Sequence, residues 1–180
     1  MLFLDPPVRT GAIEMVEAFF IDSNHQLIDV VLRRFDSVWR AKVLDGELPA
    51  RDDIDPAEFA DLLPHIMLAD LVEEDEGFVV EPRLVGQHHL TLSGTIPGKT
   101  VLNASMGEGA FAFMGLDDII ERGQPRYSML RVWCSGADHF EAARAVYPLS
   151  SDGKHIDRII SIVVPYHKSG KGPVEALAAG

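Results

Sequence analysis

The chain has 180 residues and a mass of 19.8 kDa, which is the size of one domain with a substantial hydrophobic core. Hydrophobic residues make up 47% and charged residues 24%, the proportions of a soluble globular protein rather than a disordered one. The 28 acidic and 16 basic residues give a net charge of −12, which argues against nucleic acid and anionic membranes as partners.

Cysteine content and hydropathy indicate the cellular compartment of the protein. The single cysteine, Cys134, excludes an internal disulfide framework and any multi-cysteine zinc or iron–sulfur site. No apolar run approaches the ~20 residues of a membrane span, and no signal-peptide pattern follows Met1. We therefore predict a cytoplasmic protein.

The N-terminal part divides into an ambiguous segment and a helix. The apolar period of residues 1–22 suits a strand and a helix equally well, so their structure is left open. Ser23 and Gln26 form a capping box, which predicts a long helix over residues 24–44. Its apolar residues recur at helical spacing and are Leu27, Val31, Phe35, Val38 and Trp39.

A connector, a short helix and two strands are predicted next. Asp55 is a good N-cap and Pro56 suits the first helical position, so a short helix begins there and ends before Pro64. The apolar period then changes to two, which predicts strands over residues 65–72 and 78–85. Pro82 lies in the second strand and restricts it to the edge of a sheet.

The second half of the chain contains helical pieces and then three strands. Residues 87–123 are rich in Gly, Ser and Thr, and the clearest helix in them spans residues 109–121. Three consecutive strands are predicted over residues 126–133, 139–149 and 158–166, and a tail follows over residues 168–180.

This order of elements predicts an α+β fold. A five-stranded antiparallel sheet with helices on one face and a long N-terminal helix is the packing that it favours. The domain is expected to span residues 23–167, with residues 168–180 as a flexible tail.

Four strings of residues resemble a known family. They are Leu48-Pro49-Ala50-Arg51-Asp52-Asp53-Ile54-Asp55-Pro56, Leu62-Leu63-Pro64, Arg83-Leu84-Val85-Gly86 and Tyr147-Pro148-Leu149-Ser150-Ser151-Asp152-Gly153. On these residues the chain is similar to a PAS-like family known mainly from alphaproteobacteria, the fifth PAS fold family. The resemblance spans about residues 27–164 and implies a free-standing sensory domain with a PAS fold.

Histidines and the cysteine were considered as cofactor ligands. His88 and His89 precede the helical block, where haem-binding PAS domains offer their ligands, but a pair of loop histidines is the interpretation we favour. Cys134 lies beside a hairpin turn, whereas the reactive cysteine of flavin-binding PAS domains begins the helical block. We therefore predict no cofactor and no metal.

The last hairpin supplies the candidate binding site. Tyr127, Met129, Arg131 and Trp133 share one strand face by the two-residue period. If the hairpin is symmetric about Gly136, their partners are Ala145, Ala143, Glu141 and His139, and the small alanines leave room for a ligand. The opposite face might equally form the core, because it carries Leu130, Val132, Phe140 and Val146.

Arg131 is the predicted polar anchor of a ligand, because a guanidinium holds a carboxylate through two parallel hydrogen bonds. The full set of predicted ligand-binding residues is Arg131, Tyr127, Met129, Trp133, His88 and Met114. The alternative is a cross-strand pair of Arg131 with Glu141, worth under about 1 kcal/mol if exposed.

The predicted function is that of a sensory or regulatory module, not an enzyme, that binds an unidentified small molecule and signals through a protein partner. A ligand-free interaction adaptor and, third, a small enzyme on the same fold are the alternatives. A homodimer is also predicted, through apolar residues of the N-terminal region, namely Phe19, Phe20, Leu27, Val31, Phe35 and Trp39.

Overall fold

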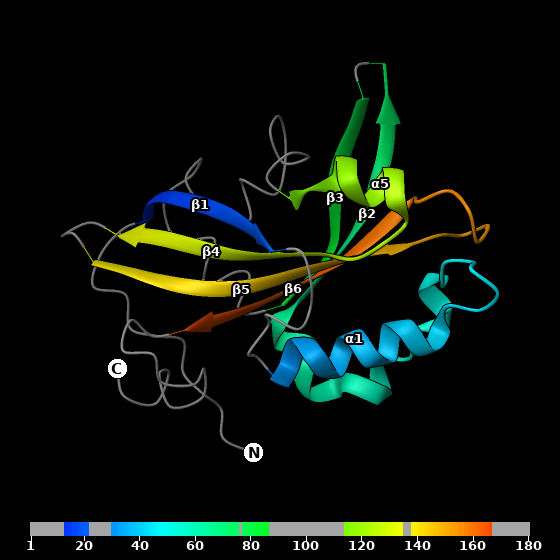
Figure 1. The fold of residues 1–180 in the computed structure, drawn as a ribbon, viewed down its shortest axis with the longest axis horizontal. Coiled ribbons are helices and arrows are strands. Elements are labelled where there is room, and N and C mark those ends of the chain that lie inside the picture. Colours follow the sequence, from blue (N-terminus) through cyan, green and yellow to red (C-terminus); the bar gives the residue numbers. More distant parts are fainter. Residues whose placement is uncertain (1–12, 22–29, 76, 87–113, 135–137, 167–180) are drawn as a thin grey trace.

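A computed structural model of the chain describes residues 13–21, 30–75, 77–86, 114–134 and 138–166. These residues form one antiparallel sheet of six strands in the order β1-β4-β5-β6-β2-β3 (Figure 1). The strands are β1 (Ile13–Ile21), β2 (Ile66–Glu74), β3 (Gly77–Val85), β4 (Arg126–Cys134), β5 (Asp138–Leu149) and β6 (Arg158–Tyr166). The helices are α1 (Val30–Lys42), the 3-10 helices η2 (Arg51–Asp53) and η3 (Pro56–His65), and α5 (Leu116–Arg122).

The α+β class and the antiparallel sheet are confirmed, but the number of strands was wrong. All five predicted strands form, and the sixth, β1, comes from the segment that was left open. β1 pairs with β4 at the edge of the sheet. Pro82 lies in β3, which is an edge strand as predicted.

The helices lie on both faces of the sheet rather than on one (Figure 1). The reason is the strand period of two: Ala145 and Tyr147 of β5 pack under α1, whereas Val146 between them packs under α5. We call these the α1 face and the α5 face. Each has its own buried apolar cluster, so each needs a helix to cover it.

Aromatic side chains hold α1 against its face of the sheet. Phe35 and Trp39 are buried, and their rings lie 5.0 and 5.8 Å from that of Tyr147. The indole Nε1 of Trp39 also donates a hydrogen bond of 2.9 Å to the carbonyl oxygen of Pro148. Phe35 and Trp39 therefore belong to the core of their own chain and do not supply the dimer surface that we expected from them.

The described part of the N-terminal helix is shorter than predicted. α1 has 13 residues and ends at Lys42. A tight turn follows, in which Leu44 bridges to Glu47 and Asp45 takes a left-handed φ of 53°. This turn stops the helix two residues early, and the predicted residues 24–29 lie outside the described ones.

Asp55 caps η3 as predicted, because its Oδ1 accepts a hydrogen bond of 2.9 Å from the amide of Ala57. The helix passes through Pro64, contrary to prediction. Phe59 has non-helical backbone angles, so the element consists of two short turns joined at a kink. Pro64 falls one residue before the end of the second turn, where the missing amide donor breaks little regular structure.

Gly86 explains why one of the family strings ends in glycine. Its amide donates a hydrogen bond of 2.7 Å to the carbonyl oxygen of Ile66. A Cβ atom at this position would lie 2.5 Å from the carbonyl oxygens of both Leu63 and Pro64. No side chain fits there, so only glycine lets β3 end against η3.

Candidate functional site

The register of the β4–β5 hairpin is as predicted. Tyr127 pairs with Ala145, Met129 with Ala143, Arg131 with Glu141 and Trp133 with His139. The symmetric hairpin assumption therefore placed every cross-strand pair correctly.

The six predicted site residues do not come together. Tyr127 and Met129 lie on the α1 face, whereas Met114 is buried in the apolar cluster of the α5 face. These three side chains cannot line one pocket, because the sheet separates them. The backbone of Trp133 lies opposite His139, its side chain lies outside the described part, and so does all of His88.

Arg131 adopts the geometry of the alternative that we weighed. Its Nη2 lies 3.3 Å from Oε1 of Glu141, and the two side chains are 39% and 46% exposed. Its guanidinium carbon also lies 5.3 Å from the centre of the Phe19 ring, which is a cation–π contact. A role of Arg131 in ligand binding stays a prediction.

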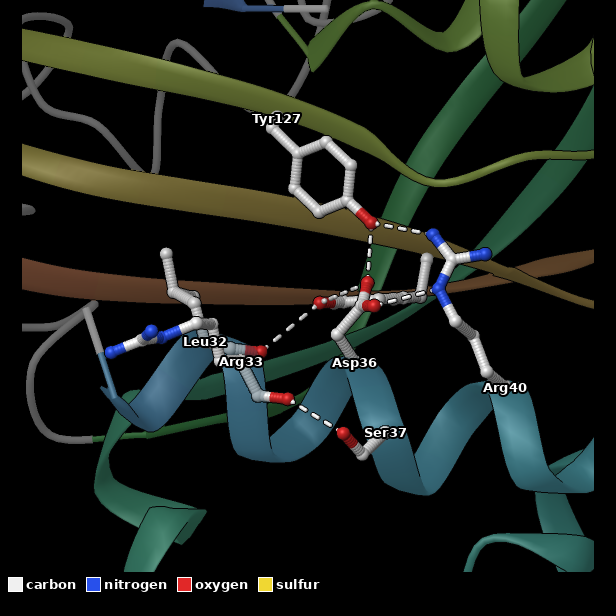
Figure 2. Close-up of polar contacts among 7 residues, drawn as sticks. Leu32, Arg33, Asp36, Ser37, Arg40 and Tyr127 are labelled. Carbon is white, nitrogen blue, oxygen red and sulfur yellow. Dashed lines mark hydrogen bonds and ion pairs between the residues drawn. The ribbon is translucent and has the colours of Figure 1, made fainter. Parts of the chain in front are cut away.

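Tyr127 instead belongs to a buried polar network that joins α1 to the sheet. Figure 2 shows the carboxylate of Asp36 between Tyr127 and Arg40. The Tyr127 hydroxyl donates to Oδ1 of Asp36 and accepts a 3.0 Å hydrogen bond from Nη2 of Arg40. Nε of Arg40 lies 2.6 Å from the other carboxylate oxygen, and the Tyr147 hydroxyl donates to Oδ1 over 3.3 Å.

The network has a clear electrostatic consequence. Burial raises the pKa of Tyr127, and the adjacent Asp36 carboxylate raises it further. Burial likewise raises the pKa of Tyr147, with the same carboxylate as the second cause. Both hydroxyls therefore stay protonated and act as donors to Asp36 over the whole physiological range of pH.

Arg144, the second-largest of the fully buried side chains, was not predicted as a site residue. Arg144 lies in β5 two residues before Val146, so it points to the α5 face. It is 1% exposed, and its Nε donates a hydrogen bond of 3.0 Å to the Ser128 hydroxyl on β4. The sequence feature that could have indicated this buried site is an arginine inside the otherwise apolar run from Ala142 to Val146.

Two buried serines accompany Arg144 on the same face. Ser128 is the direct cross-strand partner of Arg144. Ser161 of β6 pairs with Val146, which makes it a diagonal neighbour of Arg144, and both serines are 1% exposed. A strip of one guanidinium and two hydroxyls therefore crosses three strands of a buried face.

Burial alone lowers the pKa of Arg144 to about 9, from an ordinary value of 12.5. The group still carries its positive charge at neutral pH. A cation in a low-dielectric environment attracts an anion far more strongly than one at the surface. The strip is therefore suited to hold a carboxylate or another small anion.

Among the described residues, no group of three or more His, Cys, Asp or Glu side chains is placed to hold a metal ion. In the same residues, no helix is long and apolar enough to cross a membrane.

Comparison with known protein families finds a match over part of the chain. Residues 29–100 match the model of a family described as PAS domain. This stretch of 72 of the 180 residues is similar to PAS domains. The matched residues run from α1 through β3 and include the Leu48–Pro56 string and Gly86, so the resemblance noted from the sequence is confirmed. PAS domains serve as sensory and regulatory modules, and this class of function is what the match supports.

Solved structures show weaker similarity. The LOV protein of Rhodobacter sphaeroides is 15% identical, with 77% of this chain and 71% of that chain covered and a TM-score of 0.39. A single-residue variant of RsLOV is also 15% identical, with 78% and 72% covered and a TM-score of 0.37. Comparison with curated proteins finds no match.

Proposed function

We propose that this PAS domain is a sensory module that binds a small molecule with a carboxylate group against the α5 face of its sheet. Arg144 is the proposed anchor, and the observation that carries the proposal is its complete burial on that face. Ligand sites in proteins are mostly apolar and contain a few fixed polar groups, which is the composition of this face around Arg144, Ser128 and Ser161.

The energetics of burial support an anionic ligand. Removing a guanidinium from water costs several kcal/mol unless an opposite charge or several acceptors compensate for it. The Ser128 hydroxyl on β4, which accepts a hydrogen bond from Nε of Arg144, is neutral and does not supply an opposite charge. A carboxylate would offset the burial of Arg144 and would raise its lowered pKa again.

The same two strands offer a route from the ligand to an output. Ser128 and Arg144 point to the α5 face, while their neighbours Tyr127 and Ala145 point to the α1 face. Tyr127 holds Asp36 of α1. A change in the position of β4 on ligand binding would therefore act on α1, through which we propose that a partner protein reads the state of the domain.

Thermal melts with acetate, succinate and citrate test the proposal, with neutral succinamide as the matched probe. Binding to the folded state alone stabilises it by about 2.7 kcal/mol at a hundredfold excess over Kd. At this chain length, each kcal/mol of stabilisation raises Tm by roughly 2–4 °C. Native and denatured masses of the freshly purified protein reveal any carboxylate that co-purifies.

Two variants assign the effect. Arg144→Met keeps an unbranched apolar stem in place of the guanidinium side chain and removes a buried charge, so the fold should survive while the carboxylate shift disappears. Arg131→Gln, on the opposite face, should leave the shift unchanged. If no carboxylate binds and nothing co-purifies, the proposal is wrong and the ligand-free adaptor is favoured. Turnover of a bound molecule would favour the enzyme.

A further inference from the structure

The outer edge of β1 is open in the described part of the chain. β1 pairs with β4 on one side, and none of the described strands pairs with its other side. Such an edge presents backbone amides and carbonyls that another strand can pair with. Neither the ligand site nor the α1 network uses this edge.

The two edges of the sheet differ in how they are protected. β3, at the far edge, carries Glu81, Pro82 and Arg83, and a bulge breaks its register with β2. A proline, charged residues and a bulge are devices that prevent strand pairing at an edge. β1 carries Glu14, Glu17 and a register shift near its start, but it has no proline, lysine or arginine, and it exposes 47% of Phe19 and 38% of Phe20.

The two phenylalanines show what kind of partner fits. Phe19 lies next to Arg131 and Phe20 next to Arg126, with their ring centres 5.3 and 4.9 Å from the two guanidinium carbons. Because the residues are consecutive in a strand, their side chains lie on opposite faces of the sheet. A helix or loop would cover one face only, whereas a strand added in the plane of the sheet covers both.

We propose that the strand is β1 of a second copy of this chain, paired antiparallel about a twofold axis at Ala18. The register irregularity between Ile13 and Met15 leaves Met15–Ile21 as the regular part of the edge. Ala18 is the midpoint of this run, so an axis there pairs all of it with itself. An isologous twofold contact is also the commonest arrangement of homodimers.

Charge favours pairing about Ala18 over pairing about the adjacent residue, Glu17. With the axis at Ala18, Phe19 faces Glu17 of the partner subunit, and the guanidinium of Arg131 already lies over the Phe19 ring. Phe20 then faces Val16 of the partner subunit, so the pairing continues along the regular part of the strand. An axis at Glu17 would instead place two carboxylates directly opposite each other, which destabilises a strand pair.

Light scattering of the full chain at tens of micromolar tests the proposal, with an expected mass of twice 19.8 kDa. Phe19→Lys should give the monomer, because it places a cation on the edge next to Arg131. Leu84→Lys is the matched control on β3, where Leu84 is 46% exposed, and it should leave the dimer intact. A monomeric wild-type protein, or equal loss in both variants, would overturn the proposal.

Crosslinking tests the register and does not depend on the folding of Phe19→Lys. Two cysteines at position 18 would face each other across the axis within the Cα separation of about 4.4–6.8 Å that a disulfide needs. Ala18→Cys in a Cys134→Ser background should therefore form a covalent dimer under an added oxidant, and Leu84→Cys should not. A dimer in which only Leu84→Cys crosslinks would overturn the assignment to β1. The outcome is independent of carboxylate binding.

Discussion

The α1 face and the α5 face of the sheet both bury polar groups, but they do so differently. On the α1 face, Asp36 receives hydrogen bonds from Tyr127, Tyr147 and Arg40, and the network joins a helix to two strands. On the α5 face, Arg144 donates to a hydroxyl on a strand that is already its neighbour. The first arrangement contributes to the fold, whereas the second places a buried charge beside a neutral hydroxyl of the adjacent strand.

Because of this difference, substitutions on the α1 face should affect the stability of the fold, and substitutions of Arg144 should affect ligand binding. Groups that link distant elements should cost stability when they are removed. Replacing the buried cation of Arg144 with an apolar side chain should cost little stability, and its loss should appear in ligand binding. The experiments below use this contrast, with the Arg144→Met variant as the reference for the α5 face.

The largest effect is expected for Asp36→Ala. The substitution leaves two buried tyrosine hydroxyls and Arg40 without their shared acceptor, so the free energy of unfolding should fall by about 3 kcal/mol. Asp36→Asn is the matched control, because its amide oxygen still accepts from the hydroxyls, and it should lose clearly less. Chemical denaturation measures both. Equal losses in Asp36→Ala and Arg144→Met would contradict the contrast between the faces.

Much of this fold could be predicted from local sequence patterns, but the strand β1 could not. The two-residue period and turn residues predicted five strands and the full β4–β5 register. The run Ile13–Ile21 is apolar on both sides because it carries a phenylalanine on each face, so its period could not distinguish strand from helix. Its partner β4 lies more than a hundred residues away, and only tertiary pairing decides the structure.

The candidate site was harder to predict for a similar reason. Arg131 stands in a strand of alternating character, and the apolar run Ala142–Val146 around Arg144 was the single local sign that this arginine is buried. Burial depends on which helix covers which face, and both faces of this hairpin are apolar enough to form a core. The prediction of helices on one face therefore led to the exposed arginine rather than the buried one.

An intermediate effect, with a distinctive pH dependence, is expected for Tyr127→Phe. At neutral pH the loss of the hydroxyl should cost about 1 kcal/mol, because Asp36 keeps Arg40 and Tyr147. In the unfolded chain a tyrosine has a pKa of about 10, and burial raises the pKa of Tyr127 in the folded protein. The stability that Tyr127 contributes is therefore complete below about pH 10 and is lost as the pH rises toward the folded pKa.

The measurement is the difference in unfolding free energy between wild type and Tyr127→Phe as a function of pH. Arg144 changes the stability in the opposite direction over this range, because its lowered pKa makes the free energy of unfolding rise above about pH 9. Both proteins contain Arg144, so its contribution cancels in the difference. The difference should be constant from pH 7 to about 10 and should shrink above that. A difference that grows with pH would contradict the assignment of Tyr127 as a buried donor.

The smallest effect is expected for Arg131→Gln, and it separates the two arginines of the hairpin. Both partners of the Arg131–Glu141 pair are more than a third exposed, so solvent screens their attraction and the pair is worth under about 1 kcal/mol. The aliphatic part of glutamine also keeps some of the contact with Phe19. We expect a change in Tm within the scatter of surface substitutions and unchanged carboxylate binding. If Arg131→Gln abolished carboxylate binding while Arg144→Met did not, the α1 face would be the ligand face. The anchor chosen from the sequence would then be correct, and the buried guanidinium of Arg144 would serve only the packing of the α5 face.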